Sequence, residues 1–141
     1  MEIVSWRQAL AIMDNRLSPV ADREAAARFL KKFPEPQAVP RLVRALQDED
    51  FGVRWAASEA LSRLGVHALE AVLRVLADPN QVGDPRLRDS AYHMLHLGQQ
   101  WPVSVKGLMR SLKGPAADLA TLEEAARLLQ LLKSAGRDAS P

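Results

Sequence analysis

The chain has 141 residues, a length typical of one domain, and it contains no cysteine, which excludes disulfides and thiolate metal sites. Its formal net charge of +2 is too small to indicate nucleic-acid binding by itself. No secretory signal and no apolar run long enough to span a bilayer is recognisable, so we expect a cytoplasmic protein without a membrane segment. Apolar residues make up 48% of the chain and aromatic residues only 5%, a balance that favours closely packed helices.

Residues 3–34 are predicted to form a first pair of helices. Trp6, Leu10 and Met13 share one face of the first helix, and residues 22–30 form the second. The next two predicted pairs span residues 36–65 and 67–98.

These two pairs reveal an internal repeat. Segments 38–48 and 68–78 align at an offset of 30, and their apolar residues coincide at the spacing of one helix face. The second helices that follow also align, although the later pair has a longer turn between its helices. A helix pair that recurs at this period predicts stacked units that share one core.

A fourth, more degenerate pair is expected over residues 102–133. Val105, Leu108 and Leu112 give its first helix an apolar face, and an Ala- and Leu-rich second helix follows. We therefore predict a single repeat domain over residues 1–133, followed by a frayed tail over 134–141.

The segment 38–65 resembles a HEAT repeat of the short bacterial kind that also occurs in phycobilisome-lyase-like proteins. The matching features are the run Ala-Val-Pro-x-Leu-Val-x-x-Leu at 38–46 and then Asp48, Asp50, Val53-Arg54, Ala56-Ala57, Ala60-Leu61 and Leu64-Gly65. With the weaker repeats, the resemblance covers about residues 3–133. It implies an all-α fold, a right-handed α-α superhelix of four helix-pair repeats, in which the second helices line a concave surface.

A ladder of charged residues follows the repeat. Arg23, Arg54 and Arg88 occupy the same position in successive second helices, while Asp48 and Asp78 follow first helices. The resemblance implies that such Arg and Asp side chains bridge neighbouring repeats. The alternative for these positions is ligand binding.

Signals of catalysis are weak, because no phosphate-binding loop, dinucleotide fingerprint, nucleophile elbow or HExxH motif occurs. His93 and His96 share a spacing that could chelate zinc or nickel, with Glu59 or Asp89 as a further ligand, or they form an exposed polar pair. We predict no catalytic residue, no metal and no cofactor.

Two enzyme groups resemble this chain through the same repeats. Deoxyhypusine hydroxylase carries His-Glu pairs, and none occurs here. Bilin lyases share the repeat consensus, but no distinctive lyase motif is present. A bilin lyase-like or metal-dependent enzyme is therefore the least favoured of the alternatives.

The concave surface is the predicted site of partner binding. Trp55 stands where other repeats have Glu24 and Asp89, and it either presents its ring to a partner or folds over a neighbouring repeat. The residues expected on this surface are Trp55, Glu59, Arg63, Tyr92, His93, His96, Arg28 and Lys32.

Basic residues gather in two stretches, and they support the main alternative to protein binding. Those stretches comprise Arg23, Arg28, Lys31, Lys32, Arg41 and Arg44, then Arg86, Arg88, Lys106, Arg110 and Lys113. They would suit a phosphate backbone or an acidic protein surface. We predict a scaffold or adaptor that binds a partner protein, with a nucleic-acid-binding module as the alternative; the oligomeric state stays open.

Overall fold

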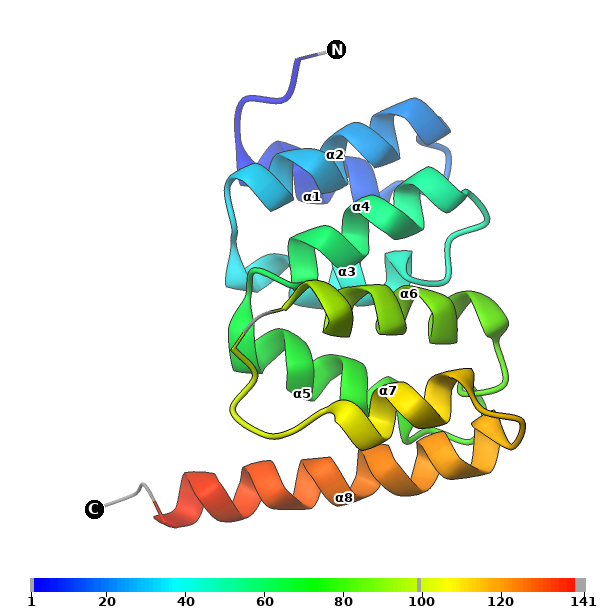
Figure 1. The fold of residues 1–141 in the computed structure, drawn as a ribbon. Coiled ribbons are helices and arrows are strands. Elements are labelled where there is room, and N and C mark those ends of the chain that lie inside the picture. Colours follow the sequence, from blue (N-terminus) through cyan, green and yellow to red (C-terminus); the bar gives the residue numbers. More distant parts are fainter. Residues whose placement is uncertain (1, 99, 139–141) are drawn as a thin grey trace.

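The computed structural model describes residues 2–98 and 100–138, and this part of the chain contains helices but no strand. Figure 1 shows the helices stacked in series along the chain. The α-helices are α1 (Trp6–Asp14), α2 (Val20–Lys32), α3 (Val39–Ala45), α4 (Phe51–Leu61), α5 (Gly65–Leu76), α6 (Pro85–Leu97), α7 (Lys106–Lys113) and α8 (Ala117–Asp138), and a 3₁₀ turn, η1 (Pro36–Ala38), precedes α3.

The helices form two layers of neighbouring pairs. In one layer α2 packs against α4 and α4 against α6, and in the other α1 meets α3 and α3 meets α5 (Figure 1). Each pair therefore buries its apolar faces against the next pair. This arrangement confirms the predicted all-α solenoid of helix pairs.

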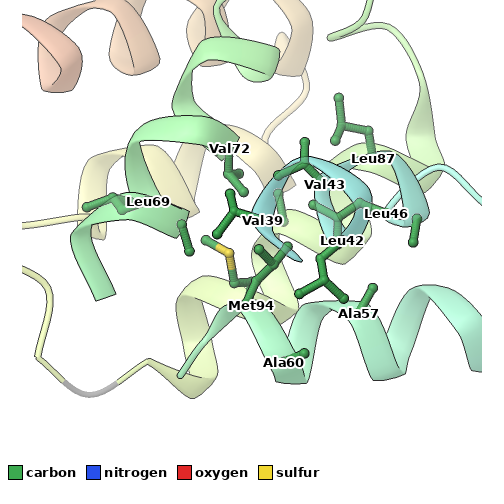
Figure 2. Packing of buried hydrophobic residues seen from close by; sticks show 14 of the residues in the cluster. Val39, Leu42, Val43, Leu46, Ala57, Ala60, Leu69, Val72, Leu87 and Met94 are labelled. Atoms are coloured by element: carbon green, nitrogen blue, oxygen red, sulfur yellow. The ribbon is translucent and has the colours of Figure 1, made fainter. Parts of the chain in front are cut away.

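A continuous apolar seam runs between the layers. Figure 2 shows part of it, in which Leu42 of α3, Leu69 of α5 and Met94 of α6 are among the fully buried residues. Ala57 and Ala60 of α4 are fully buried. Because these two side chains are small, α4 can approach its neighbours on both sides closely.

Local sequence explains where the helices begin and turn. Pro40 lies in the first turn of α3, where its missing N–H costs little. The Asp50 carboxylate caps α4 by accepting a hydrogen bond of 3.0 Å from the Val53 amide. Gly65 has a φ of 64°, a left-handed conformation that glycine adopts without strain, and it connects α4 to α5.

The last pair is placed differently from the others. We expected α7 to act as a first helix and α8 as a second helix, but α7 packs beside α6 and α8 packs beside α5. The connecting segment is fastened to α6, since the Trp101 indole Nε1 donates a 3.0 Å hydrogen bond to the Leu95 carbonyl. Ala125 and Leu128 of α8 are fully buried, so α8 closes this end of the core.

The helix α8 is longer than we expected from the sequence. It continues to Asp138, whereas we predicted a frayed tail from Ser134 onward. The helix continues through Gly136 even though glycine has a low helix propensity. The end of the predicted tail, residues 139–141, lies outside the described residues. Among the helices described, none combines the length and the apolar character that crossing a membrane requires.

The buried seam predicts that truncating a leucine within it lowers the free energy of unfolding much more than truncating an exposed leucine does. Leu42→Ala should lower the free energy of unfolding by about 2–5 kcal/mol, because Leu42 is fully buried and its truncation leaves a cavity. Leu131→Ala on α8 is the matched control, since its side chain is 43% exposed. Urea unfolding followed by circular dichroism measures both. Equal losses for the two variants would contradict a seam centred on α3.

Candidate functional site

The outward side of α2, α4 and α6, which we call the second-helix face, carries the predicted partner-binding residues. On α4 the outward residues recur every four positions at Phe51, Trp55 and Glu59, and Arg63 continues this spacing just beyond the helix. Such spacing places side chains in one line along a helix. Arg28 and Lys32 lie on α2, and Tyr92, His93 and His96 lie on α6.

Three rings stack across α4 and α6. The Phe51 and Trp55 ring centroids lie 5.2 Å apart, and the Trp55 and His93 centroids lie 3.1 Å apart with an angle of 17° between the ring planes. Trp55 is 42% exposed and Phe51 is 62% exposed. One side of the Trp55 ring is therefore covered by a neighbouring repeat, while much of the side chain faces solvent. Sequence reasoning missed Phe51, although its position one turn before Trp55 was a usable signal.

The His93 side chain is partly buried within this stack, and its surroundings alter its pKa. Burial lowers the pKa of His93 below 6.5, nearby His96 and Lys31 lower it further, and Glu59 opposes them. Its Nε2 atom is buried, and no hydrogen-bond partner for that atom occurs within the described part of the chain. On the same helix the His96 ring stacks with Tyr92 at a centroid distance of 6.4 Å. In residues 2–98 and 100–138, no group of three or more His, Cys, Asp or Glu side chains is placed to hold a metal ion.

A groove of about 500 Å³ opens at the C-terminal end of α4. Its walls include Lys31 and Glu59, which form an ion pair between α2 and α4, together with Arg63 and Trp101. Trp101 lies against Gly98 so closely that a Cβ atom at Gly98 would fall 2.0 Å from the indole Cζ2. Glycine is thus needed at this position for Trp101 to form the wall. The repeat pattern gave no signal for Trp101, because it lies in a connecting segment.

Each of the three ladder arginines is hydrogen-bonded to the turn that precedes its own helix. Arg23 donates to the Ser18 carbonyl at 2.6 Å, Arg54 to the Asp48 carbonyl at 2.7 Å and Arg88 to the Val82 carbonyl at 2.8 Å. Each guanidinium therefore satisfies a carbonyl of the turn before its own helix, a role that fits structure rather than ligand binding.

Only some of these arginines also bridge to the next helix pair. Arg23 makes a two-pronged contact with the Asp48 carboxylate at 3.0 and 3.2 Å, which raises the pKa of Arg23. Arg88 reaches Asp118 at 2.7 Å. The Asp78 carboxylate accepts a hydrogen bond from the Asn80 amide at 2.9 Å, as Asp48 does from the Asp50 amide. No described contact joins Asp78 to Arg54.

A further bridge between the first two pairs was not foreseen. Asp14, at the end of α1, accepts hydrogen bonds from Arg41 and Arg44 of α3 at 3.2 and 2.9 Å. These two guanidinium groups lower the pKa of Asp14. No repeat spacing links Asp14 to α3, so the sequence offered no route to this contact.

Most of the first basic stretch is therefore neutralised. Arg23, Arg41 and Arg44 pair with carboxylates as described, and Arg28 pairs with Glu24 at 2.5 Å. Lys31 pairs with Glu59. At this stretch a phosphate backbone would have to compete with these internal carboxylates.

Comparison with known proteins identifies the repeat. A family model described as HEAT repeats matches residues 8–96, which is more than half of the chain. No curated protein and no solved structure gives a significant match. The match extends over the first three helix pairs, in which the first helices lie in one layer and the second helices in the other. It stops before α7 and α8, whose places in the two layers are reversed.

The lowered pKa of His93 predicts a pH dependence of stability. Between the folded-state pKa and the unfolded value of 6.5, the unfolded chain binds more protons at this position, so the free energy of unfolding should fall as the pH falls below 6.5. His93→Gln should make this dependence shallower, and His67→Gln, at an exposed position on α5 away from the stack, should not. Urea unfolding between about pH 7.5 and about pH 5.5 measures the slopes. The same slope in all three proteins would contradict a His93 held neutral by burial.

Proposed function

Because the chain belongs to the HEAT-repeat family, whose members commonly mediate protein binding, we propose that it is a non-catalytic scaffold that holds a partner protein on the second-helix face. The match identifies no catalytic family. The binding surface in this proposal centres on Trp55. The predicted concave shape of this face and the cytoplasmic location remain predictions.

The exposed ring of Trp55 is the observation that carries the proposal. The corresponding positions of α2 and α6 hold Glu24 and Asp89, so an aromatic residue at this point interrupts a polar face. Tryptophan is enriched among the residues that dominate the energy of protein interfaces. Phe51 extends the apolar area along α4, since 62% of its side chain is exposed.

The stack also prepares Trp55 for binding. His93 covers one side of the ring and Phe51 lies one turn away, so the side chain is already held in a single orientation. A side chain that is ordered before binding loses less conformational entropy when a partner arrives. The groove beside Glu59 and Arg63 adds polar groups at the border of this area, an arrangement typical of interfaces.

The proposal predicts that Trp55→Ala abolishes partner capture without unfolding the protein. Tagged wild type and variant are used to capture proteins from a lysate of the source organism, and mass spectrometry quantifies what is retained. Truncation of an interface tryptophan costs about 2 kcal/mol or more, so at least one protein should be retained about thirtyfold less.

Leu131→Ala is the matched control, because its exposed fraction of 43% equals that of Trp55 within one percentage point while it lies on α8. It should retain the partner, and circular dichroism should show the same helix content in all three proteins. The lost protein is then purified and its affinity measured directly. An identical set of captured proteins for wild type and Trp55→Ala would refute the proposal.

A further inference from the structure

The second-helix face has two chemically different ends. The N-terminal end of α4 presents the aromatic side chains of Phe51 and Trp55. Toward the C-terminal end of α4 the same line of residues becomes charged at Glu59 and Arg63. A partner that lies along α4 therefore meets an apolar surface first and a polar one afterward.

The charged end is a basic groove. A second hollow of about 350 Å³, lined by Arg28, Lys31, Lys32, Glu59 and Arg63, adjoins the groove that ends at Trp101. The two hollows share Lys31, Glu59 and Arg63, so they form one continuous surface between the C-terminal ends of α2 and α4.

The positive charge of this groove is only partly compensated. Its four cationic side chains face two carboxylates, Glu24 and Glu59, and both carboxylates are already engaged by Arg28 and Lys31. Lys32 and Arg63 are exposed, and no described residue forms an ion pair with either of them. Lys32 lies in the last turn of α2, where part of its charge offsets the helix dipole, whereas Arg63 lies beyond the end of α4.

The charge of the groove indicates which kind of partner segment would bind there. Its excess positive charge complements carboxylates, and complementary charge is what fixes partner choice and orientation at interfaces. An excess of two charges is small for a phosphate backbone, whose binding rests on the release of many counterions. The aromatic stack beside the groove adds an apolar anchor that a peptide side chain can fill.

The dimensions fit a short peptide. Trp55 and Arg63 are eight residues apart along α4 and its continuation, a rise of about 12 Å. An extended chain covers this distance in about four residues. We infer that the partner is held through a short acidic linear segment, which places an apolar side chain against Trp55 and carboxylates about four residues away against Lys32 and Arg63. This inference rests on the proposed function and specifies the partner's chemistry.

A random peptide library displayed on phage tests the inference. The library is selected against the wild-type protein, and the composition of the enriched peptides is compared with that of the unselected library. We expect an excess of Asp and Glu together with an apolar residue at a fixed distance. The strongest peptide is then synthesised with a fluorescent label, and its affinity is measured by anisotropy.

Charge reversal provides the matched comparison. The double variant Lys32→Glu with Arg63→Glu should bind the peptide about tenfold or more weakly, since two favourable contacts become repulsive. Arg74→Glu with Lys133→Glu changes the net charge equally, but it places the new carboxylates on α5 and α8, and the affinity should be unchanged. Trp55→Ala should weaken binding of the same peptide, and circular dichroism checks that each variant is folded.

The outcomes separate the inference from the proposed function. Enriched peptides that require Trp55 but carry no excess of acidic residues would overturn the inference and leave the proposed function standing. The absence of enriched peptides, or equal binding by Trp55→Ala, would also overturn the inference. In that case the capture comparison between Trp55→Ala and Leu131→Ala still decides the proposed function by itself.

Discussion

The apolar seam between adjacent helix pairs is the constraint on which the rest of the molecule depends. A single pair such as α3 and α4 has too little apolar surface to fold alone, so stability comes from contact between neighbours. Leu42 and Met94 are fully buried where several helices meet. The seam occupies the inner side of the helices, so residues on their outward side are not needed to form the core. A residue such as Trp55 can therefore be exposed there.

The polar contacts of the turns hold this stack in register. Arg23, Arg54 and Arg88 each donate a hydrogen bond to a carbonyl of the turn that precedes their own helix. Bridges such as that from Arg23 to Asp48 connect one pair to the next. The helices that present the second-helix face are therefore fixed relative to one another, and a partner would meet a prepared surface.

The fold was predictable from the sequence to a large extent because its signals are local and repeat. The apolar residues of segments 38–48 and 68–78 showed the helical spacing of a buried face, and Leu42 and Leu69 are fully buried in the structure. The last pair was the exception. Its apolar pattern identified α7 and α8 as helices, but a pattern along one helix says nothing about which layer the helix joins.

The sequence by itself determined that this chain forms helix pairs, which residues of each pair face the core, and that Trp55 interrupts a polar face. Only the tertiary structure decided that His93 stacks on Trp55, that Trp101 forms the wall of a groove and that α8 packs beside α5. The physical reason is the range of the interactions. Periodicity and capping act within a few residues, whereas these contacts depend on the path of connecting segments and on the spacing between stacked helices.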